Sequence, residues 1–453
     1  MKTSWLFSSL LLVIALSSAC GGSDSGTGGT GGTGGTGSGG KSGGGTGAVD
    51  PGGPLLDRPP GTKYSCSVSR PISRLNLPWQ GFSLVPSPDG AELAVVAADR
   101  NNPDPSRPGN SVTWSTLSLD GTLGAPSVVR EPTSQFLASV TAATAGEKST
   151  IVWTEAAPDY SSYSLNSLQV NAEGEVVTPR SVLATLGRSD PPTLARAGAG
   201  YALLWIDGNE MSAKLTFALL DESGKLASTP VIVAQGMYLA AGNIASIGQH
   251  FMVSYADYQQ RDSGLVSRLL VLGADGRVTG QPIALENSAA TGFAGTVPSL
   301  LVRGDQVLAA WSIATGDSSY ETQSAATTIR LARFDENGER QGLMYDLQAP
   351  IEDRESVQPF WVEVGDDVGL LWADGSIIYI CGGCVPNHSL KFVVLDGEDF
   401  TPRSNVVEVV NTLPSGGLLS PATARSGDDL LVVSSVTYHT SAEGASATIR
   451  CAP

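Results

Sequence analysis

The stretch GYALLWID, residues 200–207, is apolar at consecutive positions, and segments of this kind recur along the chain. Six others resemble it: AELAVVAA from Ala91, STIVWTEA from Ser149, HFMVSYAD from His250, QVLAAWSI from Gln306, DVGLLWAD from Asp367 and DLLVVSSV from Asp429. A strand that is apolar on consecutive residues, rather than on alternate ones, is typically buried on both faces. The seven segments therefore predict seven equivalent strands, each of which lies between two neighbouring layers.

Glycine turns keep step with these strands. The glycines before the seven segments are Gly90, Gly146, Gly198, Gly248, Gly304, Gly365 and Gly427. The dipeptides of a second turn are Asp120-Gly121, Glu173-Gly174, Ser223-Gly224, Asp275-Gly276, Asn337-Gly338 and Asp396-Gly397. Such turns supply the positive φ that tight hairpins need, so each unit is expected to contain four antiparallel strands. Seven such units in succession predict an all-β fold, the seven-bladed β-propeller.

The last unit ends one strand short, at ATIRCAP in residues 447–453. The missing strand is expected from TKYSCSVS in residues 62–69, so that the N-terminal strand pairs with the last blade and closes the ring. This closure brings Cys66 close to Cys451, and we expect a disulfide between them. The propeller domain is predicted to cover residues 62–453.

The N-terminal segment predicts export. Residues 1–19 have the features of a secretory signal peptide, with Lys2 as the positive charge and an apolar core too short to span a bilayer. The stretch LSSAC, ending at Cys20, resembles a bacterial lipobox. That resemblance implies cleavage before Cys20 and its lipidation, palmitate included. The family prefers leucine three residues before the cysteine, whereas Leu16 lies four before it, and ordinary signal cleavage after Ala19 is the alternative.

A low-complexity tether follows the cysteine. Of the thirty residues 21–50, sixteen are glycine and none is aromatic, so we expect residues 20–61 to be a disordered link to the propeller. The glycine after Cys20 implies, under the same resemblance, an outer-membrane protein that faces the periplasm or the cell surface. The combination of Cys20, GGT repeats and a propeller resembles the uncharacterised surface lipoproteins of myxobacteria-like bacteria. Residues 87–90, SPDG, resemble a strand turn of TolB-like propellers, which bind protein partners.

Two further cysteines, Cys381 and Cys384, flank Gly-Gly. In an oxidising compartment this pair predicts a small disulfide at a loop tip. A redox C-x-x-C pair and a metal site completed by His388 are the alternatives, but neither has the surrounding pattern that it needs. Lipidation of Cys20 would leave four of the five cysteines, an even number.

The long segments between the second and third strands of the blades are expected to form the binding face. They contain six of the eleven tyrosines together with several carboxylates. The residues singled out are Tyr160, Tyr163, Tyr258, Tyr320, Tyr379, Tyr438, Asp317 and Asp374. Tyrosine with serine, glycine and aspartate suits adaptable recognition, since binding usually resides in variable loops on a rigid scaffold. The alternative is that these are solvated loops without a ligand.

The net charge and the residue motifs limit the classes of function that fit this sequence. The net charge of −17 argues against binding of nucleic acid or anionic lipid headgroups. No catalytic residue set and no cofactor is expected, apart from weak calcium binding by acidic loops. The prediction is a monomeric, non-catalytic binding or scaffolding module, anchored to the membrane through lipid, for a protein or glycan of the cell envelope. The alternative is a polysaccharide hydrolase or lyase that uses loop carboxylates such as Asp317 or Asp374.

Overall fold

The computed structural model shows a ring of β-sheets. It describes residues 49–75, 82–86, 93–99, 111–118, 120–131, 135–188, 190–209, 211–258, 265–285, 297–315, 326–351, 354–380, 383–413, 418–426, 429–437 and 442–453. A short 3-10 helix, η1 (Leu55–Asp57), precedes the first strand. Within the described ranges, no helix is long and apolar enough to cross a membrane.

The described strands form seven blades of four antiparallel strands, as the glycine turns and apolar segments predict. Blade 1 comprises β2 (Phe82–Pro86), β3 (Leu93–Asp99), β4 (Ser111–Leu117) and β5 (Ser127–Arg130). Blade 2 comprises β6 (Phe136–Ala145), β7 (Lys148–Ala156), β8 (Tyr163–Val170) and β9 (Val176–Leu186). Blades 3 and 4 comprise β10 (Thr193–Ala197), β11 (Gly200–Asn209), β12 (Ser212–Leu220), β13 (Val231–Ile247), β14 (His250–Tyr258), β15 (Leu265–Leu272) and β16 (Ile283–Ala284).

The remaining strands complete the ring. Blade 5 comprises β17 (Ser299–Arg303), β18 (Gln306–Thr315), β19 (Ala326–Asp335) and β20 (Arg340–Asp346). Blade 6 comprises β21 (Arg354–Val364), β22 (Asp367–Ile380), β23 (Gly383–Leu395) and β24 (Val407–Leu413). Blade 7 comprises β25 (Leu418–Ser426), β26 (Asp429–Thr437), β27 (Ala442–Ala452) and β1 (Ser65–Leu75).

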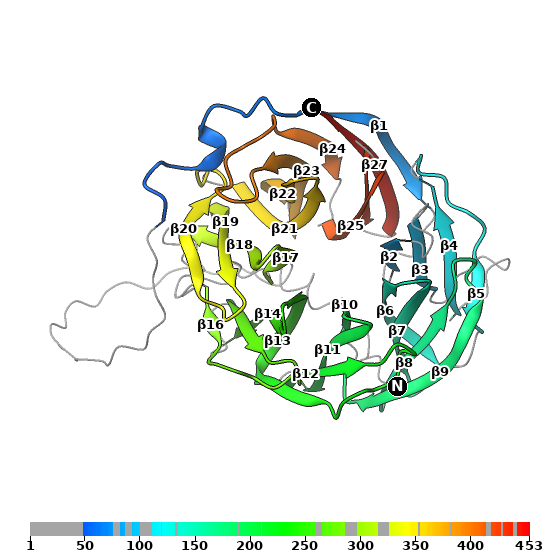
Figure 1. Ribbon diagram of the computed structural model, residues 1–453. Helices are drawn as coiled ribbons and strands as arrows, with labels where there is room; N and C mark the ends of the chain where they lie inside the picture. The colour runs from blue at the N-terminus through cyan, green and yellow to red at the C-terminus, as the bar shows by residue number, and fades with distance from the viewer. Residues whose placement is uncertain are drawn as a thin grey trace, which may run out of the picture.

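The first strand of each blade lies at the centre of the ring and the last at its outer wall (Figure 1). Blades 3 and 4 share one strand, because β13 pairs with β12 through residues 231–236 and with β14 through residues 237–247. The chain thus passes from the outer wall of blade 3 to the inner edge of blade 4 without a break. These two blades form one continuous seven-stranded sheet.

Among the described residues, the hydrophobic core forms seven clusters, one at each interface between neighbouring blades. In β11, Tyr201, Leu203 and Trp205 pack towards blade 2, whereas Ala202, Leu204 and Ile206 pack towards blade 4. Successive side chains of a strand point to opposite faces, so a strand between two blades must be apolar at every position. GYALLWID is apolar at consecutive positions because both faces of this strand are buried between blades.

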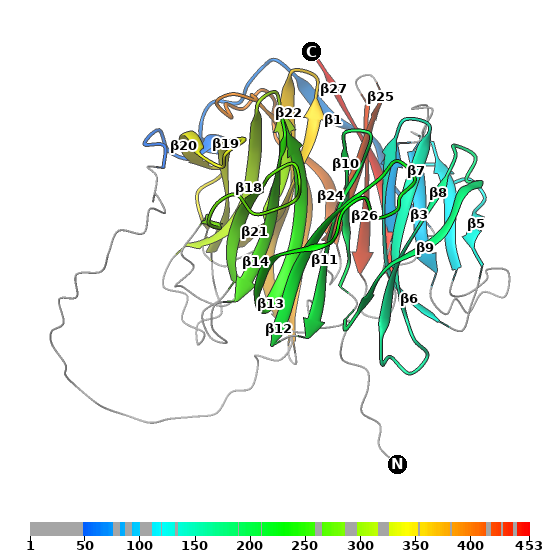
Figure 2. The same cartoon turned by 60° about the horizontal axis from the view of Figure 1, so that its bottom comes forward.

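Both sets of glycine turns lie on one rim of the ring, which we call the turn rim. The other rim, which carries the connections between second and third strands, is called the loop rim; Figure 2 shows the two rims from the side. Among the described first turns, φ is 56–61° at Gly146, Gly198, Gly248, Gly304 and Gly365. Among the described second turns, φ is 72–83° at Gly121, Gly174, Gly224, Gly276 and Gly338. These glycines adopt the left-handed backbone that tight turns require.

Gly276 provides a test of how turns and blades fit together. Its φ is 76°, and a Cβ atom there would lie 2.7 Å from Cδ1 and Cε1 of the buried Phe217 in blade 3. The variant Gly276→Ala should therefore lose about 1–3 kcal/mol of unfolding free energy beyond the cost of the left-handed backbone. The matched control is Gly304→Ala, where φ is 60° and nothing lies within 4 Å of the added atom. Equal losses in urea denaturation of the two variants would contradict the packing argument.

The N-terminal strand closes the ring, as predicted. β1 pairs with β27 in antiparallel register, with Cys66 opposite Cys451, and the two cysteines form a disulfide. Nearby, Asn405 accepts a hydrogen bond from the Cys66 amide and donates one to the Cys66 carbonyl oxygen. Blade 7 is thereby joined to blade 6 at the outer wall.

Residues 49–64 form an ordered strap along the outer wall of blades 5 and 6. Val49 forms a parallel bridge with Met344, and Tyr64 forms one with Ser404. Leu55 is fully buried in the core cluster between these blades. Residues 49–61, assigned above to the tether, thus pack against the propeller, and the packed chain includes residues well before Thr62.

Two local expectations for blade 6 need correction. The segment between the second and third strands of blade 6, expected as a long loop that carries Asp374 and Tyr379, mostly continues the strands: β22 extends to Ile380 and β23 begins at Gly383. The β-branched and aromatic residues of the run Ile-Ile-Tyr-Ile at 377–380 favour this extension of the ladder. In the second turn the positive φ belongs to Phe400 (58°), not to Gly397, and the Phe400 ring lies 5.8 Å from that of Trp361.

Candidate functional site

The residues expected to form the binding face, where the structure describes them, differ in exposure. Tyr160 is 57% exposed, has a left-handed backbone (φ 56°), and lies in the connection between β7 and β8. Its amide donates to the Ala157 carbonyl, and Asp159 accepts hydrogen bonds from the Ser161 amide and hydroxyl. This closed turn presents the Tyr160 ring to solvent. Tyr163, by contrast, begins β8 and packs against the core between blades 2 and 3.

The other candidate residues are less fully defined. Tyr258 is the last residue of β14 and Tyr379 lies in β22, opposite Cys384 of β23; their side chains are outside what the structure describes. The candidates that lie outside the described residues altogether are Cys20, Tyr320, Tyr438, Asp317 and Cys381. The disulfide between Cys381 and Cys384 therefore stays a prediction.

Asp374 is a strand residue within β22 and is buried in an ionic cluster rather than displayed on a loop. Both Arg354 and Lys391 pair with its Oδ2. Its Oδ1 accepts hydrogen bonds from Ser356 Oγ at 2.8 Å and from Gln348 Nε2 at 2.9 Å. Burial raises the pKa of Asp374, but these four donors outweigh it and lower the pKa to about 2. The carboxylate is thus held ionised and fully engaged.

A second cluster of the same design lies between blades 1 and 2 and was not anticipated. The buried Glu155 of β7 accepts from Arg130 Nε at 2.8 Å and Trp153 Nε1 at 2.6 Å, and pairs with Arg180 Nη2 at 3.0 Å. Arg130 belongs to blade 1, so this ion pair crosses the blade interface. In both clusters one buried carboxylate faces two cations, a structural arrangement that needs all its members.

A sequence signal for these carboxylates does exist. Each lies two residues after an aromatic residue of the second strand, and the pattern recurs in four blades. The members are Trp153-Thr154-Glu155, Trp205-Ile206-Asp207, Tyr255-Ala256-Asp257 and Trp372-Ala373-Asp374. Asp207 accepts from the Gly187 amide, and Asp257 pairs with Arg268 at 2.9 Å. An acidic residue at a fixed position in buried strands indicates an internal partner rather than a ligand.

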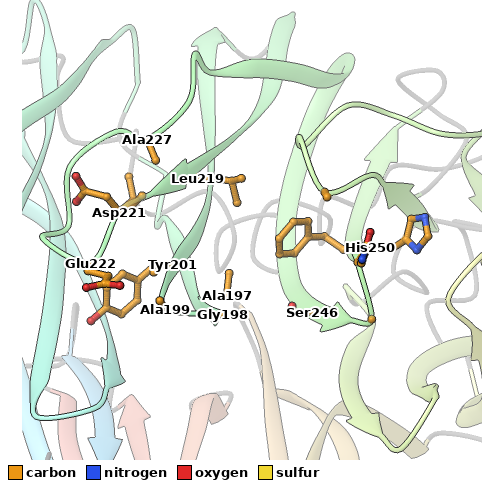
Figure 3. Close-up of a pocket in the computed structure, with 16 residues that line it drawn as sticks. Ala197, Gly198, Ala199, Tyr201, Leu219, Asp221, Glu222, Ala227, Ser246 and His250 are labelled. Atoms are coloured by element: carbon orange, nitrogen blue, oxygen red, sulfur yellow. The ribbon is translucent and has the colours of Figure 1, made fainter.

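A cavity opens on the turn rim between blades 3 and 4, with a volume of about 450 Å³. We call it the rim pocket. The lining residues used below are Tyr201, Leu219, Asp221, Glu222, His250 and Phe251. Figure 3 shows Tyr201, Asp221 and Glu222 on one wall, with Ser246 and His250 on the other. The first and second turns of blades 3 and 4 line its mouth, so the glycine turns of the repeat create this site.

Several polar side chains of the rim pocket are buried or already have partners within the protein. Tyr201 is nearly fully buried, and burial raises the pKa of this tyrosine. His250 Nδ1 lies 3.6 Å from Glu336 of blade 5. Burial raises the pKa of Asp221, but hydrogen bonds from Ser223 and Lys225 lower it overall. Throughout the described part of the chain, no three His, Cys, Asp or Glu side chains are placed to hold a metal ion.

No protein-family model matches the chain, and no curated protein matches it. A thermostable family-43 glycoside hydrolase is 12% identical, with a TM-score of 0.36 over 57% of this chain and 87% of that one. The endo-arabinanase of Bacillus licheniformis is 9% identical, with a TM-score of 0.34 over 59% and 97%. A prolyl endopeptidase is 12% identical, with a TM-score of 0.43 over 81% and 46%. Similarities this distant carry no information about the ligand or activity of this chain.

Proposed function

We propose that this chain is an exported, lipid-anchored β-propeller that acts as a non-catalytic binding or scaffolding module for a protein or glycan of the cell envelope. The signal-like residues 1–19, Cys20 and the glycine-rich tether support export and anchoring. The acidic net charge argues against anionic partners recognised through a basic surface. The loop rim is the proposed binding face.

The observation that carries the non-catalytic reading is the state of Asp374. A general acid in glycoside hydrolysis needs a raised pKa, and a nucleophile needs a free carboxylate oxygen. Asp374 has a pKa lowered to about 2, and both of its oxygens are bonded to internal partners. It therefore links β21, β22 and β23 of blade 6 to one another and to the connection from blade 5. The enzymatic alternative then rests on other loop carboxylates such as Asp317, which lies outside the described residues.

The loop-rim proposal is tested by changing tyrosines. Serine should replace Tyr160, Tyr258, Tyr320, Tyr379 and Tyr438 together, whereas Tyr163 should remain because it packs against the core. We expect this variant to lose at least tenfold in affinity for the ligand that a glycan array or an envelope pull-down identifies, since aromatic residues dominate binding energies. The unfolding midpoint should remain close to that of the unchanged protein.

The control is Val182→Ser, which removes a side chain of β9 that is 60% exposed on the outer wall. Its ligand affinity should be unchanged. Equal affinity of the tyrosine variant and the unchanged protein would reject the loop rim as the binding face. Release of shortened oligosaccharides from an array glycan would instead identify an enzyme.

A further inference from the structure

We propose that the rim pocket binds a basic peptide segment, with an apolar side chain inside the pocket and a lysine or arginine at Asp221 and Glu222. This site lies on the rim opposite the loop rim, so the inference goes beyond the proposed function and does not depend on it. It rests on the shape of the rim pocket, on the carboxylate oxygens left without hydrogen bonds among the described residues, and on the charge at its mouth.

The interior of the rim pocket suits an apolar group. Leu219 and Phe251 contribute apolar walls, and Phe251 is braced by the Phe217 ring, 5.2 Å away. Ala197, Ala199 and Ala227 carry only methyl groups, which leaves the space open. Its volume of about 450 Å³ is within the range of pockets that take small ligands or peptide side chains. Tyr201 is 1% exposed and packs towards blade 2, so it lies behind this wall and adds little open surface.

The mouth of the rim pocket suits a cation. Asp221 uses Oδ1 to accept hydrogen bonds from the Ser223 amide and hydroxyl and from the Lys225 amide. Among the described residues, no hydrogen bond reaches its Oδ2. The lowered pKa keeps this carboxylate ionised at neutral pH. Glu222 is exposed next to it, and Gln169 Nε2 holds the Glu222 carbonyl at 2.7 Å.

The charges around the rim pocket favour the same ligand. Asp221 and Glu222 are its two lining carboxylates, whereas Lys225 and Arg196, the nearby cations, are not among its lining residues. His250 faces Glu336. A guanidinium or ammonium group can therefore approach two adjacent carboxylates without meeting a cation of the pocket wall. Charge-assisted hydrogen bonds of this kind are about twice as strong as neutral ones.

The test uses fluorescein-labelled hexapeptides and the full chain, with binding measured by fluorescence anisotropy at low and physiological salt. One set places a single lysine or arginine next to leucine, valine or phenylalanine, and the matched set has glutamate in place of the basic residue. We expect binding of the basic set alone, weakened by added salt. The double variant Asp221→Asn/Glu222→Gln should lower the affinity about tenfold. The asparagine side chain of this variant keeps the Oδ1 acceptor of the turn, so the fold is retained.

Two further variants test whether binding needs the open cavity and whether it depends on the charges of this particular turn. Ala227→Phe should abolish binding by filling the rim pocket, without any change in charge; its backbone bond to the Leu219 carbonyl is unaffected. Glu173→Gln/Glu175→Gln removes two charges from the second turn of blade 2 and should leave the affinity unchanged. Failure of every basic peptide to bind, equal binding of the glutamate set, or equal weakening by the blade 2 variant would each overturn the proposal. Loss of loop-rim ligand capture in the tyrosine variant, with peptide binding intact, separates the two sites.

Discussion

Replacing Cys66 and Cys451 together with serine should lower the free energy of unfolding by about 3–5 kcal/mol. The disulfide links positions 385 residues apart in the sequence, so its loss releases the unfolded chain from a constraint over almost the whole propeller. It also unlocks the one blade that is assembled from both ends of the chain. Guanidinium denaturation under non-reducing conditions, monitored by tryptophan fluorescence, measures the effect.

The native state retains other contacts at this closure, which is why the variant should still fold. β1 keeps its ladder with β27, and Lys63 and Tyr64 bond to Asp367 at 2.5 and 2.9 Å. The control is Cys381→Ser/Cys384→Ser, because a disulfide there would close only a short loop and stabilise far less. An unchanged midpoint for the Cys66/Cys451 variant would show that the ring closes without help from the disulfide.

The variant Asp374→Asn should lose about 3–5 kcal/mol, because it leaves the cations of Arg354 and Lys391 without their buried partner. The exposed pair of Asp429 and Arg450 provides the matched control. There, Asp429→Asn should cost less than about 1 kcal/mol, since water screens both charges. Equal losses in urea denaturation would contradict the structural role of the buried cluster.

Lowering the pH should weaken the ionic cluster around Asp374. The pKa of Asp374 is lowered from 3.8 to about 2, so the folded state favours the ionised form. Its contribution to stability is fully present above the unfolded value of 3.8 and is lost as the pH falls towards 2. The size is about 2 kcal/mol. In unfolding measured between pH 5 and pH 2, Asp374→Asn should show a shallower decline than the unchanged protein; parallel curves would contradict the assignment.

A triple substitution distinguishes the loss of one partner of the Asp374 cluster from the removal of all three of its charges. Leucine at positions 354, 374 and 391 together removes all three charges and leaves none unpaired. Buried ion pairs replaced by apolar residues of similar volume often cost nothing. We therefore expect Arg354→Leu/Asp374→Leu/Lys391→Leu to be more stable than Asp374→Asn alone. The comparison tests whether the penalty comes from the unpaired cations.

The sequence predicted the propeller because the patterns that specify its strands and turns involve residues close together in the chain. Consecutive apolar residues in one strand, such as β11, report burial on both faces, and a glycine such as Gly146 reports a turn. These patterns repeat seven times, so the propeller and its closure follow from them. The Cys66–Cys451 disulfide followed as well, because the missing strand of the last blade had one available source.

The partners of the buried carboxylates and the position of the rim pocket depend on contacts between segments that are far apart in the sequence. No local sequence pattern shows these contacts. The sequence predicted Asp374 as a loop carboxylate between the second and third strands of its blade, whereas the β22–β23 ladder continues past it and its partners come from several segments. Arg130 and Glu155 meet only because neighbouring blades stack. The rim pocket exists because the turns of blades 3 and 4 lie side by side.

The sequence by itself therefore determined most of the strands and turns, the number of blades and the way in which the ring closes. Only the tertiary structure decided which carboxylates are neutralised, where the strap of residues 49–64 lies, and where a cavity opens. Strand and turn formation depends on residues close in sequence, through backbone geometry and alternating burial. Charge pairing and cavities depend on groups such as Lys63 and Asp367, 304 residues apart, whose distance is fixed only when the blades pack.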